Sequence, residues 1–233
     1  MKALMLTTIA AAGLLGLALA IAAQEDGGSS SAESPPSSAA GGDAVACANL
    51  IYAGTRSSVC FSDKFLSTLA RDTTINTARK FKPVKVADRE LFEYPFAIMT
   101  GEGGFTLTEA ERLNLRRYLE RGGFLLASAG CSSKQWDDSF RREVRIIFPD
   151  RELEIISMEH EIFHTVYDIT SLKTKGAPAK LMGLTIAGKI VLVYSSDGLN
   201  DTSTMHGCCC CGGNEIRNSQ QVNANILTYA LLQ

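Results

Sequence analysis

The stretch 91–133, LFEYPFAIMTGEGGFTLTEAERLNLRRYLERGGFLLASAGCSS, decides the fold of this chain. Its two short apolar runs, FAIM and FLLA, each end in a loop of small residues, as buried parallel strands do. Between the runs, Thr108 and Glu111 have the spacing of a capping box, which predicts a helix that the glycine pair 122–123 ends. The stretch therefore predicts a β-α-β unit whose strands end at one edge of a parallel sheet, where open α/β sheets bind ligands.

On both sides of this unit, strand patterns alternate with helix patterns. The sequence predicts strands at 45–52, 83–86, 153–156, 181–186 and 189–194, and helices that start near Ser62, at Asp137 or Asp138, and near Ser219. Such alternation favours a doubly wound α/β sandwich. We expect four loops, after residues 51, 99, 128 and 194, to meet at one edge of the sheet.

The first 43 residues do not read as part of this fold. Residues 1–23 combine Lys2 with a run rich in alanine and leucine and a small-x-small site, which predicts a cleaved secretory signal. The alternative is an uncleaved N-terminal anchor, since the run is nearly long enough to span a bilayer. Residues 24–43 are mostly Ser, Gly, Ala and Pro and predict a disordered linker. A single domain, 44–233, is then secreted or periplasmic, with no stable membrane span after cleavage.

The charge balance limits the classes of partner. Without Lys2 the chain has 22 basic and 25 acidic residues, a net charge near −3. Such a surface has no broad positive field, which argues against nucleic acid. The expected partner is a small molecule or another protein.

Several ordered segments resemble one family. They are NLIYAG (49–54), LFxYPF (91–96), LRxYLxxGGFL (115–125), FRxE (140–143) with FP (148–149), HxIFH (160–164) and NILxYAL (225–231). Together they are similar to the bacterial domain-of-unknown-function family 4159. That family is similar in fold to class I glutamine amidotransferases, which implies a three-layer flavodoxin-like sandwich with a mainly parallel sheet. The resemblance implies no activity, because fold does not fix function.

Cys131 is the first candidate for catalysis. It follows a predicted strand, where amidotransferases place a nucleophilic cysteine on a sharp turn that forms an oxyanion hole. The pattern departs from that turn, because no glycine stands at the second position after Cys131 and no His-x-Glu pair lies near the C-terminus. His160 would have to serve as the base. The alternative is a loop cysteine without a catalytic role.

The segment 160–164, HEIFH, formally satisfies the H-E-x-x-H pattern of zinc proteases. Its flanks do not make the long amphipathic helix that this chemistry requires, and the resembling family has proline in place of Glu161. We therefore expect His160 on a loop or at an element end near the ligand edge of the sheet, and not on a regular helix with His164.

Four consecutive cysteines, Cys208, Cys209, Cys210 and Cys211, precede a glycine pair. Four adjacent thiols cannot all reach one tetrahedral metal, but alternate ones could bind zinc together with His206 and with Cys131 or His160. In an oxidising compartment the competing outcome is disulfides that involve Cys47 and Cys60. A loop of free thiols is the third alternative.

Four further residues are expected at the ligand edge of the sheet: Gly101, Glu102, Gly130 and Asp197. Two classes of function follow. The first is a non-catalytic binding or scaffold module that has lost the amidotransferase triad. The second is a thiol- or metal-dependent hydrolase that uses Cys131 or residues 208–211 with His160.

Overall fold

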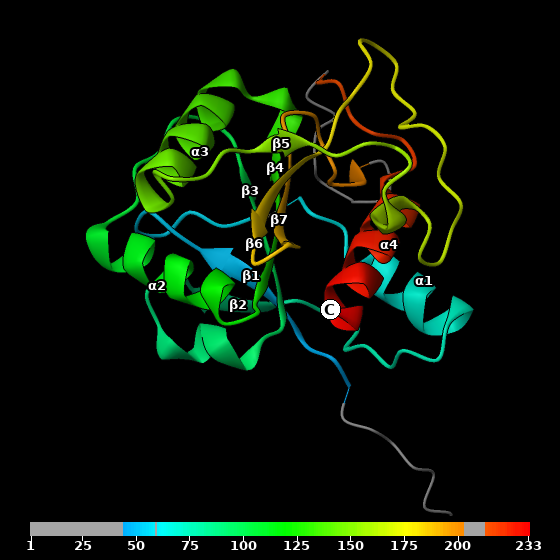
Figure 1. Ribbon diagram of the computed structural model, residues 1–233, viewed down its shortest axis with the longest axis horizontal. Helices are drawn as coiled ribbons and strands as arrows, with labels where there is room; N and C mark the ends of the chain where they lie inside the picture. The colour runs from blue at the N-terminus through cyan, green and yellow to red at the C-terminus, as the bar shows by residue number, and fades with distance from the viewer. Residues whose placement is uncertain (1–43, 59, 203–212) are drawn as a thin grey trace, which may run out of the picture. The chain divides into compact units, whose positions relative to one another are not determined.

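The protein folds around one seven-stranded sheet, shown in the computed structural model of Figure 1, which describes residues 44–58, 60–202 and 213–233. The strands are β1 (Cys47–Ile51), β2 (Lys82–Lys85), β3 (Phe96–Gly101), β4 (Phe124–Ala129), β5 (Glu154–Ile155), β6 (Met182–Ile186) and β7 (Lys189–Ser195). Their order in the sheet is β2-β1-β3-β4-β7-β6-β5. The first five strands in this order are parallel, and β6 pairs antiparallel with both β7 and β5.

Helices cover both faces of the sheet (Figure 1). One face carries α2 (Glu109–Glu120) and α3 (Lys134–Ile147), and the other carries α1 (Lys64–Asp72) and α4 (Ser219–Leu232). Short 3₁₀ helices connect these elements, among them η1 (Arg89–Glu93), η2 (Gly130–Ser132) and η3 (Glu161–Phe163). The predicted three-layer sandwich with a mainly parallel sheet is confirmed. Within the described ranges, no helix is both long and apolar enough to cross a membrane.

The protein has one apolar core on each face of the sheet, between the sheet and the helices that cover that face. Two cores form because successive side chains of a strand point to opposite faces. Along β3, Ala97 and Met99 face α2 and α3, whereas Phe96 and Ile98 face α1 and α4. All four side chains are at most 1% exposed. Burial on both faces explains why the strands read as continuous apolar runs in the sequence.

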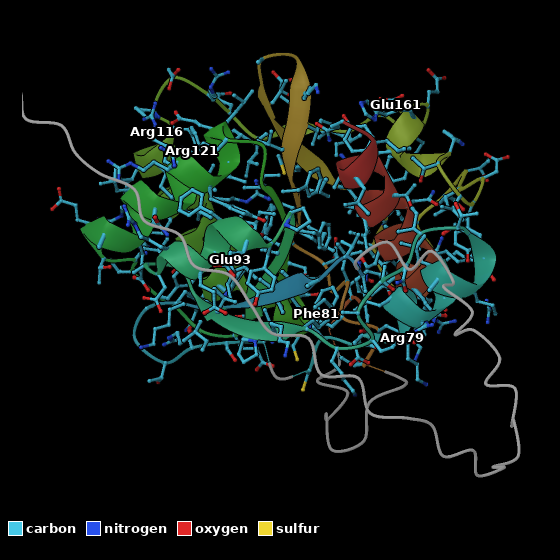
Figure 2. The ribbon with its side chains drawn as sticks, turned by 90° about the horizontal axis from the view of Figure 1, so that it is seen from below. Arg79, Phe81, Glu93, Arg116, Arg121 and Glu161 are labelled. Atoms are coloured by element: carbon cyan, nitrogen blue, oxygen red, sulfur yellow. The ribbon has the colours of Figure 1, made fainter. Side chains whose placement is uncertain are left out.

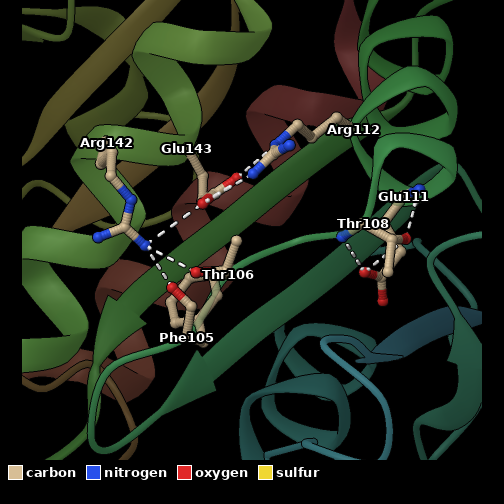
Figure 3. Close-up of polar contacts among 7 residues, drawn as sticks. All are labelled: Phe105, Thr106, Thr108, Glu111, Arg112, Arg142 and Glu143. Carbon is tan, nitrogen blue, oxygen red and sulfur yellow. Dashed lines mark hydrogen bonds and ion pairs between the residues drawn. The ribbon is translucent and has the colours of Figure 1, made fainter.

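The central β-α-β unit forms as its local signals predict. Thr108 Oγ1 accepts a hydrogen bond from Glu111 N at 3.2 Å, and a carboxylate oxygen of Glu111 accepts one from Thr108 N at 2.7 Å (Figure 3). Gly122, with φ 93°, ends α2 in the left-handed conformation that glycine adopts without strain. The capping box and the glycine stop thus fix the length of α2.

The start of α3 differs from the sequence prediction. Ser133, not Asp137 or Asp138, is its N-cap, and its hydroxyl accepts a hydrogen bond from Trp136 N at 3.4 Å. The sharp turn at Cys131 and Ser132 lets the helix begin immediately after β4. Asp137 instead pairs with Arg141 one turn later, at 2.5 Å.

Candidate functional site

The loops after β1, β3, β4 and β7 meet at the carboxyl edge of the sheet, because these four strands are parallel. The Tyr52 side chain, directly after β1, links two other elements at this edge. Its Oη donates to Thr100 O in β3 at 3.1 Å and accepts from Trp136 Nε1 in α3 at 2.8 Å. A third link runs from Arg56 Nη1 to Glu102 O, at 3.0 Å. The predicted convergence of the four loops at one edge is therefore confirmed, and hydrogen bonds link residues at this edge.

A cavity of about 600 Å³ opens at this edge. The described residues that line it come from the turn after β4, from the segment after β7, from a loop before β6 and from the start of α4. They are Cys131, Ser132, Lys175, Gly176, Gly198, Asn200, Asp201, Thr202, Gly213, Asn214, Glu215, Ile216, Arg217 and Ser219. Such a volume suits a small-molecule ligand.

Asn200 holds this edge together, although the sequence pattern did not single it out. Its Oδ1 accepts hydrogen bonds from Ser128 Oγ at 3.0 Å and from Thr100 Oγ1 at 3.4 Å, and its main-chain oxygen accepts one from Ser62 N at 2.8 Å. Only 5% of Asn200 is exposed. The sequence does contain one signal for such a residue. Thr100 and Ser128 place hydroxyl groups at the ends of otherwise apolar strands, and buried hydroxyls require a polar partner.

The two glycines that were predicted to bind a ligand lie where other groups approach the backbone closely. A Cβ on Gly101 would lie 2.3 Å from Tyr52 Oη and 3.0 Å from Trp136 Nε1. A Cβ on Gly130 would lie 3.0 Å from the main-chain oxygen of Gly101. Neither glycine is among the residues that line the cavity. Both therefore let the ends of β3 and β4 approach closely, as glycine does where backbones meet.

Cys131 lines the cavity, but it is disulfide-bonded. Its backbone, with φ 53°, is left-handed, and Ser132 follows with φ 52°. Glu102 Oε1 lies 2.9 Å from Cys131 Sγ, so a carboxylate faces the sulfur. A sulfur in a disulfide is not a nucleophile, because the attacking species is the free thiolate. In this oxidised form Cys131 does not have the chemistry of a catalytic cysteine.

Two further cysteines are described. Cys60 is also disulfide-bonded. Cys47 is a free thiol inside β1, and burial raises its pKa to about 12. The prediction that disulfides involve Cys47 is therefore wrong, because the β1 backbone points its side chain into the α1–α4 core.

Asp197 lies beside the cavity and not in its lining. Asn214 Nδ2 donates to its carboxylate at 2.9 Å, and its own main-chain N–H donates to Ser195 Oγ at 3.1 Å. Partial burial raises the pKa of Asp197, whereas the bond from Asn214 lowers it and the charge of Asp137 raises it. Asp197 thus orients Asn214, which does line the cavity.

His160 does not lie at the carboxyl edge, so that part of the prediction is wrong. Its ring packs edge-on against Tyr229, with centroids 5.6 Å apart, and Tyr229 packs against Phe124 at the start of β4. Ser219, at the cavity, and Tyr229 are ten positions apart in α4, about 15 Å along its axis. Residues 157–173 run back along α4, which carries His160 to the amino edge of the sheet.

The zinc-protease geometry is not formed, as expected. His160 is the N-cap of the three-residue η3, and its Nδ1 accepts from Ile162 N at 3.1 Å. His164 instead contacts Asp168 Oδ1 at 2.6 Å and Met158 O at 2.8 Å. Figure 2 shows Glu161 on the α4 side of the sheet, opposite Arg116 of α2 and Arg121, the C-cap of that helix.

The predicted metal ligands are only partly covered by the structure. His206 and Cys208, Cys209, Cys210 and Cys211 lie outside the described residues. In the described ranges, no three His, Cys, Asp or Glu side chains come close enough to hold a metal ion. His160 and Cys131 are not brought together, so they cannot complete one zinc site in this arrangement.

Residues 48–231 match the model of a family described as a domain of unknown function, DUF4159. The chain belongs to this family. The matched range includes all of the sandwich's strands and helices except Cys47, the first residue of β1, and Leu232, the last residue of α4. The described residues that line the cavity fall inside it. A comparison with curated proteins gave no match. The similarity in fold to class I glutamine amidotransferases stays a prediction.

Proposed function

We propose that this DUF4159 domain is a non-catalytic binding module, which takes a small molecule in the cavity at the carboxyl edge of its sheet. The observation that carries the proposal is the cavity itself, about 600 Å³ at the edge where open α/β sheets bind ligands. Its lining mixes main-chain groups of Gly198 and Gly213 with the side chains of Asn200 and Asn214. Cys131, the cysteine of this lining, is disulfide-bonded, so we assign the cavity a role in binding a ligand and not in converting it.

The competing function is a thiol- or metal-dependent hydrolase that uses Cys131, or residues 208–211, with His160. The left-handed turn at Cys131 favours it, because strained turns are common at active sites. Two observations speak against it: the sulfur of Cys131 is oxidised, and His160 packs at the amino edge of the sheet. A base for Cys131 would have to come from another group.

We further propose that the domain works outside the cytoplasm, after cleavage of the signal at residues 1–23 and on the linker 24–43. The disulfide bonds of Cys60 and Cys131 support this, because disulfides persist in oxidising compartments. Mass spectrometry of the protein from fractionated cells should find a mature N-terminus near residue 24 in the exported fraction. A full-length protein in the cytoplasmic fraction would contradict export.

A binding screen with a matched pair of variants tests the proposed function. Thermal unfolding is measured with a library of small metabolites, for the wild type, Lys175→Trp and Lys189→Trp. Both lysines are exposed, but only Lys175 lines the cavity. A ligand should raise the melting temperature of the wild type and of Lys189→Trp, and not that of Lys175→Trp, whose indole obstructs the cavity.

Two results would overturn the binding function. One is a library in which no compound stabilises the wild type. The other is hydrolysis of activated ester or amide substrates that Cys131→Ser abolishes, which would instead establish the hydrolase. The assay is run with and without reductant, so that both redox forms of Cys131 are tested.

A further inference from the structure

The N-terminus of α4 forms part of the cavity wall, through Ile216, Arg217 and Ser219. Its N-cap, Asn218, does not cap the helix with its side chain. That side chain is used elsewhere, because its Oδ1 accepts from Lys173 N at 2.8 Å and its Nδ2 donates to Ser171 O at 3.1 Å. No acidic residue stands in the first turn. The positive end of the α4 dipole is thus not neutralised by its own first turn.

A second, independent feature lies at the same place. Ser219 is fully buried, lines the cavity, and its Oγ has no hydrogen-bond partner. A buried hydroxyl without a partner destabilises a fold, so natural structures rarely keep one. Ser219 stands at the first helical position. Its N–H already donates to Ile216 O and that of Gln221 to Asn218 O, both at 3.1 Å, so its unpaired hydroxyl is the group that can serve an acceptor here.

The charges around this point are mixed. Lys175 and Arg217 are exposed and line the cavity, and in the described part of the chain neither of them forms an ion pair. Asp201 and Glu215 line it as well. The Glu215 carboxylate accepts from Thr202 N at 2.8 Å and from Thr202 Oγ1 at 2.6 Å, so it is held against the segment after β7. Lys175 and Arg217 are therefore the side chains of this lining that can pair with an anion beside Ser219.

We propose that the ligand of this cavity carries a phosphate or carboxylate group, which binds at the N-terminus of α4. This inference rests on the proposed binding function and names the chemistry of its ligand. The anion accepts a hydrogen bond from Ser219 Oγ and lies on the positive end of the helix dipole. Lys175 and Arg217 supply the counter-charge, and Lys175 reaches the cavity lining from the loop before β6.

Titration with inorganic phosphate, and separately with succinate, tests the proposal on the full chain by calorimetry and thermal unfolding. Ser219→Ala should weaken binding of the preferred anion about tenfold, the equivalent of about 1.4 kcal/mol. Lys175→Ala with Arg217→Ala should weaken it by a similar factor and reduce the salt dependence of binding. Whichever anion binds more tightly identifies the group as phosphate or carboxylate.

Ser58→Ala is the matched control, because Ser58 Oγ is also buried without a partner but lies outside the cavity lining. Both serine variants remove an unpaired hydroxyl and should be at least as stable as the wild type, and only Ser219→Ala should lose anion affinity. Equal anion binding by Ser219→Ala and Ser58→Ala would overturn the inference. If neither anion binds while a neutral compound from the metabolite screen does, the anion site is wrong and the binding function stands.

Discussion

The buried ion pair between α2 and α3 gives the sharpest prediction about stability. Glu143 receives bonds from Arg112 Nε at 2.7 Å and Arg112 Nη2 at 3.3 Å, and from Arg142 Nη2 at 3.3 Å (Figure 3). Arg142 also contacts the main-chain oxygen of Phe105, which ties the loop after β3 to α3. We predict that Glu143→Leu destabilises the protein by leaving Arg112 without its partner.

The magnitude follows from the exposure of the two side chains. Glu143 is 2% exposed and Arg112 is 25% exposed. Removal of one partner from a buried pair costs about 3–5 kcal/mol. Because a quarter of Arg112 can be rehydrated, we expect the lower end, a loss of about 3 kcal/mol in the free energy of unfolding. Arg142, at 44% exposed, stays hydrated and adds little.

Urea unfolding without reductant, followed by the fluorescence of the single, fully buried Trp136, measures this loss. Glu120→Leu is the matched control, because Glu120 pairs with Arg116 on the same helix with both side chains 41% exposed. Loss of such an exposed pair should cost no more than about 0.5 kcal/mol. Arg112→Met combined with Glu143→Leu should recover most of the loss, since an apolar pair of similar volume needs no counter-charge.

The reasoning is refuted if Glu143→Leu costs no more than Glu120→Leu. It is also refuted if the double variant is as unstable as Glu143→Leu, because the loss would then come from the shape of leucine and not from the unpaired guanidinium.

Three further predictions concern single side chains. Gly101→Ala should lower the free energy of unfolding by about 2 kcal/mol, because its methyl group would displace Tyr52 Oη from Trp136; an unchanged urea midpoint would contradict this. Cys47, buried with a pKa of about 12, should resist alkylation in the native protein and react in urea, as peptide mass spectrometry can show. His164 bonds to Met158 O and Asp168, which raise its pKa above 6.5. Its stabilisation is therefore complete below about pH 6.5 and is lost as the pH rises through the folded-state value, so the melting temperatures of wild type and His164→Gln should converge above that value.

The sequence by itself determined the local elements of this domain. The capping box at Thr108 and Glu111 and the glycine stop at Gly122 involve groups within one or two helical turns. Such contacts do not depend on the rest of the fold, so α2 and its flanking strands could be predicted from the 43 residues of the stretch 91–133. The same alternation of strands and helices gave the parallel sheet and its carboxyl edge.

Only the tertiary structure decided which side chains reach that edge. Asn200 bonds to Ser128 and Thr100, which are 72 and 100 positions away in the sequence. The prediction placed His160 at the carboxyl edge, whereas the structure places it at the amino edge. Its position depends on the direction in which residues 157–173 run along α4, which no local sequence pattern encodes. Ser219 likewise reads as an ordinary helix start, and only the folded chain shows that its hydroxyl is buried without a partner and that it lines the cavity together with Cys131. Local hydrogen bonds fix the elements, whereas the composition of the site depends on long-range packing that no short segment encodes.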